Sequence, residues 1–290
     1  WSRTVTGQAF PLAVPVGYFP STGAATFATS RTGVLVYQSH IDRGRVVWLD
    51  RAGTELGVLG DPTSSSRVRI SADGRRVLLD RAQLRTGTTD IWVADLERGV
   101  EQRLTSDRFS EFGALWLPGG NAMVFSGRLP PHLLRKDLGT GVETEVLPPS
   151  RFSVAEDVSP DGKTLLFTQR TLNGTFDIWT LPADTLSGPA PLVESPFDEA
   201  SVRFSRDGRY IAFVADDLGR SEVYVLPFPV HGVRTRVSTG GGALPRWSRD
   251  GKELFYLSGD LHLMSVPVRT AAGLDVGAPP APFPGNPGAV

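Results

Sequence analysis

The chain has 290 residues, of which 40% are hydrophobic and 21% are charged, as expected for a globular protein. Its 30 Lys and Arg against 31 Asp and Glu give a net charge of −1, so no bulk charge favours nucleic acid or an anionic membrane. Without Cys there can be no disulfide, zinc thiolate site or cysteine nucleophile, and no apolar run approaches the roughly 18 residues that span a bilayer.

The first segment, residues 1–20, resembles the end of the chain. Val5–Leu12 (VTGQAFPL) is similar to Leu274–Phe283 (LDVGAPPAPF), and both are typical of the outer strand of a sheet. We therefore expect residues 1–20 to be either the strand that closes the last repeat or the tail of a preceding repeat. The chain starts at Trp1 without a signal-type segment, so we also expect a mature or excised piece of a longer polypeptide.

A turn motif of the form Ser-x-Asp-Gly recurs along the remaining chain. Four copies are clear, at 71–75, 159–163, 205–209 and 248–252, and two degenerate copies lie at 30–33 and 117–121. The glycines that anchor the copies are Gly33, Gly74, Gly120, Gly162, Gly208 and Gly251. Their successive separations of 41, 46, 42, 46 and 43 residues match the period of a four-stranded propeller blade.

Short apolar segments flank each turn. Asp at the centre of the turn and Gly after it suit a type I turn followed by a residue with positive φ, which joins two antiparallel strands. The flanking runs of four to six residues are rich in Val, Ile, Phe, Tyr and Trp, which indicates strands, and no window of twelve residues has a sustained helical period. The pattern predicts an all-β fold, a six-bladed β-propeller of four-stranded antiparallel blades.

We expect a single domain over residues 1–290. The blades are predicted at about 26–60, 67–106, 112–148, 155–195, 200–239 and 243–285. Large aromatic side chains should be buried between the blades, where their area contributes most to stability. They are Trp92, Trp116, Trp179, Phe204, Phe213 and Trp247.

The Ser159-Pro-Asp-Gly-Lys163 turn, followed by a Leu-Leu-Phe strand and then Asp177-Ile-Trp179, resembles the WD-repeat-like propeller unit of the TolB family. Segments 202–209, 222–229 and 245–256 are similar to the extracytoplasmic propeller region that follows the membrane span in bacterial serine/threonine kinases. The resemblance implies a periplasmic or extracytoplasmic sensor or binding module of a bacterial envelope or receptor-kinase protein, with a protein or peptide partner. The kinase signature motifs are missing, so kinase activity cannot lie in this chain.

Six residues lie five positions before the anchoring glycines, on the predicted innermost strands. They are Ala28, Arg69, Leu115, Asp157, Arg203 and Arg246. We predict that Arg69, Asp157, Arg203 and Arg246 line the central channel, where they could hold a small anionic ligand or a peptide carboxylate.

A structural alternative is that these arginines pair with acids such as Glu156, Asp198 or Glu199 and fix the packing of the blades. It is favoured for Arg203, which closely follows Asp198 and Glu199 in the chain. Arg246 is the more open of the two, because the preceding Gly240–Gly242 connection brings no acid near it.

No catalytic residue, metal site or cofactor is predicted, and we expect no enzyme. The Gly-x-Ser-x-Gly motif of serine hydrolases is missing, and Gly240–Gly242 lacks the helix and Lys of a phosphate-binding loop. The histidines lack metal-ligand spacing; they are His40, His132, His231 and His262. The alternative function is a propeller enzyme, a lyase or hydrolase, with a site at the channel.

Two sets of repeated acids are expected to have structural roles. The turn aspartates should accept hydrogen bonds from their own turn. A second set precedes the third strand of three blades, and a catalytic pair would occur once rather than three times. These residues are Asp90, Asp177 and Glu222.

Overall fold

The computed structural model describes residues 65–83, 86–229, 232–270 and 273–278, together with short strand segments before residue 60. These segments are 6–7, 10–11, 18–19, 24–25, 27–29, 35–38, 46–49 and 55–59. All regular elements within the described residues are β-strands, and none of these residues is helical.

No helix capable of crossing a membrane is found in the described part of the chain.

The strands form antiparallel sheets of four, each sheet built from strands that follow one another in the chain. The first comprises β5 (Phe27–Thr29), β6 (Leu35–Gln38), β7 (Val46–Leu49) and β8 (Glu55–Leu59). The next comprises β9 (Ser65–Ile70), β10 (Arg76–Ala82), β11 (Thr89–Asp95) and β12 (Val100–Arg103). It is followed by β13 (Phe112–Trp116), β14 (Ala122–Gly127), β15 (His132–Asp137) and β16 (Glu143–Glu145).

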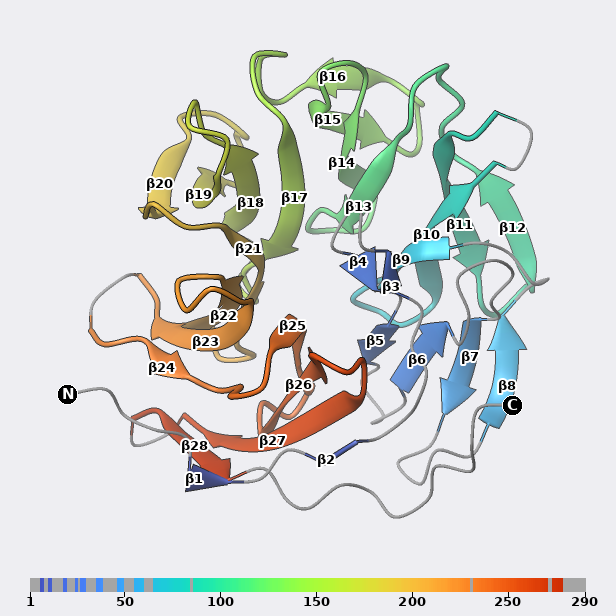
Figure 1. Cartoon of the computed structure of the whole chain (residues 1–290). Helices are drawn as coiled ribbons and strands as arrows, with labels where there is room; N and C mark the ends of the chain where they lie inside the picture. The colour runs from blue at the N-terminus through green and yellow to red at the C-terminus, as the bar shows by residue number, and fades with distance from the viewer. Residues whose placement is uncertain are drawn as a thin grey trace.

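Two more sheets repeat this order. One comprises β17 (Ser153–Val158), β18 (Thr164–Arg170), β19 (Phe176–Pro182) and β20 (Ala190–Val193). The other comprises β21 (Glu199–Phe204), β22 (Tyr210–Ala215), β23 (Glu222–Pro227) and β24 (Thr235–Arg236). The sheets are arranged radially, with the first strand of each nearest the central axis (Figure 1). The chain is an all-β propeller with four-stranded antiparallel blades.

The last sheet contains strands from both ends of the chain. Its strands are β25 (Gly242–Trp247), β26 (Glu253–Ser258), β27 (Leu263–Arg269) and β28 (Asp275–Ala278). β2 (Phe10–Pro11) pairs with Met264 and Ser265 of β27, whereas β28 pairs with Val268 and Arg269. β1 (Thr6–Gly7) then pairs with β28 in parallel, and β3 (Tyr18–Phe19) pairs with β4 (Ala24–Ala25) apart from this sheet. N-terminal and C-terminal strands therefore share the outer edge of β27.

A hydrogen-bonded turn ends the inner strand of four blades. After β21, the Ser205 hydroxyl donates to the Asp207 carboxylate over 2.6 Å, and the amide of Arg209 donates to the same carboxylate over 3.1 Å. The amide of Tyr210 donates back to the Ser205 hydroxyl over 2.9 Å. Asp73, Asp161 and Asp250 hold their turns with the same set of bonds. The predicted structural role of these aspartates is confirmed.

Bulges occur at one repeated position of the inner strands. Gly113, Ser201 and Leu244 each lie seven residues before the anchoring glycine and have φ of 70°, 56° and 57°. The pairing register shifts at each of them, as is usual for a bulge. β9 carries Arg67 at this position and stays regular from there to Ile70. Because side chains alternate along a regular strand, Arg67 and Arg69 share one face of β9.

The core lies between neighbouring blades. In one cluster, Leu166 and Ile178 of one blade pack against Val202, Phe204 and Phe213 of the next. Of the aromatic side chains predicted to be buried, four are, namely Trp116, Phe204, Phe213 and Trp247.

The other two, Trp92 and Trp179, are only partly buried and pack against the edges of the core clusters. Trp116 and Trp247 also hold neighbouring blades together. Their indole N–H groups donate to the carbonyls of Arg69 and Arg203, over 3.0 and 3.2 Å.

The turn glycines should be required because their φ is positive, and not because a Cβ would clash with a neighbouring atom. Gly74 has φ of +76°, and no atom lies within 4 Å of the place that a Cβ would occupy, whereas Gly240 has equally open surroundings without a positive φ. We expect Gly74→Ala to lower the free energy of unfolding by about 1–2 kcal/mol, the cost of the left-handed region for a residue with Cβ. Gly240→Ala should leave the urea midpoint unchanged or slightly raised, and an equal fall in both variants would contradict this account.

Candidate functional site

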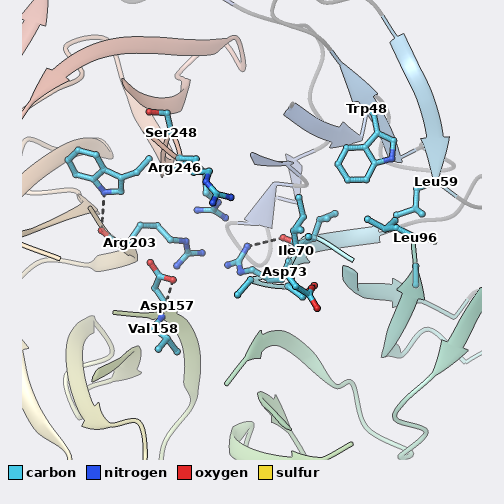
Figure 2. A pocket seen from close by; sticks show the side chains of 18 of the residues that line it. Trp48, Leu59, Ile70, Asp73, Leu96, Asp157, Val158, Arg203, Arg246 and Ser248 are labelled. Carbon is cyan, nitrogen blue, oxygen red and sulfur yellow. Dashed lines mark hydrogen bonds between the residues drawn. The ribbon is translucent and has the colours of Figure 1, made fainter. Parts of the chain in front are cut away.

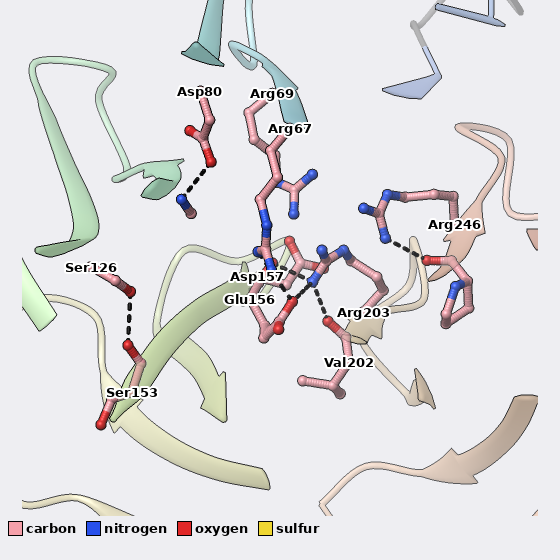
Figure 3. Close-up of polar contacts among 12 residues, drawn as sticks. Arg67, Arg69, Asp80, Ser126, Ser153, Glu156, Asp157, Val202, Arg203 and Arg246 are labelled. Carbon is pink, nitrogen blue, oxygen red and sulfur yellow. Dashed lines mark hydrogen bonds and ion pairs between the residues drawn. The ribbon is translucent and has the colours of Figure 1, made fainter. Parts of the chain in front are cut away.

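A cavity of about 1430 Å³ opens at the end of the channel where the Asp-Gly turns lie. Its rim is formed by turn residues that include Ser71, Asp73, Ser248 and Arg249. The four residues predicted from the sequence all line it; Figure 2 shows Asp157, Arg203 and Arg246 on the inner strands, and Figure 3 labels Arg69. They are Arg69, Asp157, Arg203 and Arg246. The structure thus brings the whole predicted set together in one cavity.

Arg203 is held by an acid of the preceding blade. Its Nη1 donates to the Glu156 carboxylate over 2.7 Å and to the Glu156 carbonyl over 2.5 Å, and both side chains are buried (Figure 3). Burial opposes ionisation of Glu156, but the charges of Arg203 and Arg67 hold its pKa below the usual value. Arg203 therefore ties β21 to β17 and positions the channel wall.

Two acids that the sequence offered as partners of Arg203 lie elsewhere. The carboxylate of Asp198 accepts a hydrogen bond from the amide of Phe176 over 2.7 Å. Glu199 accepts one from the hydroxyl of Ser195. Both acids precede the bulge at Ser201, at the end of β21 that is remote from its Asp-Gly turn. Proximity in sequence favoured the wrong end of the strand for these two acids, whereas Glu156, the third acid named from the sequence, is confirmed as the partner of Arg203.

The Asp157 carboxylate also holds strands of the channel wall together. Its Oδ2 accepts a hydrogen bond from the amide of Phe204 over 2.9 Å, and its Oδ1 accepts one from the amide of Val158 over 3.0 Å. Burial raises the pKa of Asp157, against the opposing influence of Arg203 and of the Phe204 amide. This carboxylate connects β17 with β21 through the backbone.

Arg69 and Arg246 have different surroundings from Arg203. Nη1 of Arg69 donates to the carbonyl of Val68 over 3.2 Å, and Nη1 of Arg246 donates to the carbonyl of Pro245 over 2.9 Å. Burial, together with the charges of Arg203 and Arg67, lowers the pKa of Arg69 to about 9. Burial, Arg203 and Arg69 lower the pKa of Arg246 well below its usual value. Positive charges are therefore crowded at this end of the channel.

Sequence reasoning missed Arg67 and Asp80. Arg67 lies 4.0 Å from the Glu156 carboxylate, and Asp80 accepts a hydrogen bond from the amide of Gly113 over 2.6 Å (Figure 3). Burial raises the pKa of Asp80 to about 6, so this carboxylate is still largely ionised at neutral pH. The alternation of Arg67 with Arg69 was the signal that could have found the first of them. Among the described residues, the lining of the cavity contains five arginines and four acids. They are Arg69, Arg203, Arg206, Arg246 and Arg249, and Asp73, Asp95, Glu101 and Asp157.

The repeated acids of the third strands are buried and have structural partners. Asp90 forms an ion pair with Arg103 over 2.8 Å. Glu222 pairs with Arg220 over 2.6 Å and accepts a hydrogen bond from the amide of Gly241 over 3.2 Å. For these two acids the predicted structural role is confirmed. Burial raises the pKa of Asp177, the third member of the set.

The described histidines are separate from the channel site. Nδ1 of His132 lies 2.9 Å from the carbonyl of Pro130, and Nδ1 of His262 lies 2.7 Å from the carboxylate of Asp260. His40 and His231 fall outside the residues that the structure describes. Within the described ranges, no group of three or more His, Cys, Asp or Glu side chains is placed to hold a metal ion.

Comparison with solved structures identifies the architecture. TolB from Acinetobacter baumannii has a TM-score of 0.64 and 20% identity, over 95% of this chain and 66% of that one. The putative TolB from Agrobacterium tumefaciens has a TM-score of 0.65 and 19% identity, over 90% of this chain and 97% of that one. The chain has the TolB propeller fold.

The same fold extends to proteins with other roles. An oligogalacturonate lyase solved in complex with manganese has a TM-score of 0.63 and 14% identity, over 84% of this chain and 77% of that one. No protein-family model and no curated protein matches the chain. At these identities the likeness establishes the fold, and the chain spans just under two thirds of the Acinetobacter protein.

The Arg203–Glu156 pair should be required for stability. Arg203→Met would leave the buried Glu156 carboxylate without its closest cation, at a cost of about 3–5 kcal/mol. Adding Glu156→Gln removes the stranded charge, so the double variant should recover a large part of the loss in thermal unfolding. If the double variant were as unstable as the sum of the two single variants, the pair would not be coupled.

Glu199 should make stability depend on pH near neutrality. Burial, with the negative charge of Asp177, raises the pKa of Glu199 to about 7 from 4.5. Because the folded state favours the protonated carboxyl, its stabilising contribution is complete below about pH 4.5 and is lost as the pH rises through 7. The loss should be on the order of 3 kcal/mol. We expect Glu199→Gln to remove this decline in unfolding scans from pH 5 to 8.

The exposed Glu97→Gln substitution is the control for this measurement and should keep the wild-type profile. A Glu199→Gln variant that declines as steeply as the wild type would contradict the assignment.

Proposed function

We propose that the chain is a non-catalytic binding module, a six-bladed propeller that binds an anionic group of a protein or peptide partner at its channel mouth. The observation that carries the proposal is the pair Arg69 and Arg246 at the base of a large open cavity. The described lining of this cavity contains five arginines against four acids. A small anionic ligand is the second occupant that this chemistry allows.

An incoming carboxylate would relieve the crowding of positive charge. Arg guanidinium groups match a carboxylate through two parallel N–H donors, and such charge-assisted bonds are stronger when the site is partly removed from water. Arg203 already donates to the Glu156 carboxylate. The Asp157 carboxylate already accepts hydrogen bonds from backbone amides. These two residues therefore position the wall, and Arg69 and Arg246 supply the donors.

The biological setting is part of the same proposal. The TolB fold and the resemblance of segments 202–209, 222–229 and 245–256 to kinase-associated propellers support a module of a bacterial envelope or receptor-kinase protein. We place it in the periplasm or another extracytoplasmic space, with residues 1–20 closing the last blade. The pairing of β1 and β2 with that blade supports this role of the N-terminal segment.

Binding is favoured over catalysis by the state of the channel carboxylates. Glu156 is paired with Arg203, and Asp157 and Asp80 accept bonds from backbone amides, so these three carboxylates are engaged in holding the wall. The competing function is a propeller enzyme that recruits a metal, as the fold of the manganese-bound lyase allows. Stoichiometric binding of Mn²⁺ in calorimetry would favour that alternative.

The test uses an array of decapeptides with free C-terminal carboxylates and varied acidic content. Peptides that bind the wild-type chain should bind the Arg69→Gln/Arg246→Gln variant at least about a hundredfold more weakly, since each charge-assisted contact contributes about 1.5–3 kcal/mol. Thermal unfolding of the variant checks that it remains folded, so that a loss of binding reports on the site.

The exposed pair Arg75→Gln/Arg98→Gln is the control and should bind as the wild type does. Equal binding by the Arg69→Gln/Arg246→Gln variant, or no binding peptide at all, would contradict the proposed function.

A further inference from the structure

The cavity continues outward from the channel mouth between two blades. Its lining there comes from the blade of β5–β8 on one side and the blade of β9–β12 on the other. Figure 2 shows Trp48, Leu59, Ile70 and Leu96 on the side of the cavity opposite Arg203 and Arg246. We call this part the interblade cleft; its residues are Trp48, Leu56, Val58, Leu59, Val68, Ile70, Leu96 and Val100.

The interblade cleft exposes apolar side chains at its outer end. Leu56 and Val100 are 59% and 57% exposed, and Val58 is 42% exposed. Leu56 and Val58 both lie on β8, whose pairing with β7 shifts by one residue at Leu56, and Val100 begins β12. By contrast, Leu166, Ile178 and Phe213 are fully buried between two later blades. A contiguous exposed apolar surface beside a cavity marks a site of interaction.

The volume of the cavity and its charged, polar and apolar lining favour one class of ligand. At about 1430 Å³ it exceeds the roughly 300–1,000 Å³ of pockets that hold small molecules. One end presents the guanidinium groups of Arg69 and Arg246, and the other presents the interblade cleft. The lining also contains Ser71, Asp95 and Ser248. A polypeptide can hydrogen-bond to such groups with its backbone, whereas an acyl chain would leave them without partners.

We propose that the cavity binds an extended acidic and apolar segment of a partner protein, with a carboxylate at Arg69 and Arg246 and apolar side chains in the interblade cleft. This inference rests on the proposed function and adds to it the class of ligand and the second half of the site. The apolar side chains supply affinity through burial, and the carboxylate fixes the direction of the segment.

The experiment uses three sets of synthetic decapeptides. In the first set Leu and Trp occupy one half and Asp and Glu the other, in the second Ser replaces the apolar residues, and in the third Asn and Gln replace the acids. The first set should bind at least about tenfold more tightly than either of the other two. Each set is measured by fluorescence anisotropy against the wild-type chain.

Exposed positions allow matched variants. Leu56→Ser and Val100→Ser should each weaken binding of the first set about tenfold, and neither should affect the second set. Leu218→Ser and Val142→Ser are the controls, at 52% and 57% exposure and away from the cavity, and they should bind as the wild type does. Because all four side chains are largely exposed, the variants should remain folded.

The outcomes separate the two proposals. Peptide binding that depends on Arg69 and Arg246 but not on Leu56 or Val100 would overturn the cleft inference and leave the proposed function standing. If no peptide of any set binds, both are wrong. Binding of dodecanoate in place of the peptides, sensitive to Leu56→Ser, would identify an acyl chain as the occupant and overturn the peptide assignment.

Discussion

The turn that ends each inner strand is the constraint on which the channel depends. In four blades a serine hydroxyl and an aspartate carboxylate satisfy the polar groups of the turn, and a glycine takes the left-handed conformation that follows. These bonds fix the residue at which the strand stops. They thereby determine which side chains reach the axis, and the residues immediately before the turns become the channel wall.

The charged side chains of the channel wall differ in the partners that compensate their charge. A buried ion is stable only when it is paired or hydrogen-bonded, and Arg203 meets this condition through Glu156 of the neighbouring blade. Asp157 meets it through backbone amides. Arg69 and Arg246 donate to carbonyl groups and stay close to other cations, and on this crowding of positive charge the proposed binding of an anion rests.

The two faces of the propeller differ in their polar chemistry. The face of the Asp-Gly turns carries the guanidinium cluster and the large cavity. Toward the opposite face, the ends of the third and first strands bury acids such as Asp90, Glu199 and Glu222 against local partners. Those acids hold neighbouring strands together, and the ionisation of Glu199 in particular affects stability.

The repeating unit and its turns could be predicted from the sequence, because local rules govern both. The Asp-Gly spacing predicted the four-stranded blade, and the position five residues before each glycine identified Arg69, Asp157, Arg203 and Arg246 as neighbours in one cavity. The partners of these side chains depend instead on the packing of the blades. The sequence named Glu156, Asp198 and Glu199 as candidate partners, and only the packing of the blades decides that Glu156, from the neighbouring blade, pairs with Arg203.

Tertiary packing also determines what faces the channel. Leu115 occupies the same repeat position as the arginines but packs into the core between blades, whereas Arg203 and Arg246, which also follow bulges, line the cavity. β9 is regular from Arg67 to Ile70 and adds Arg67 beside Arg69. The interblade cleft likewise depends on how closely two separate sheets approach each other. Spacing in the chain fixes which residue types recur, whereas register shifts and contacts between blades fix where their side chains lie.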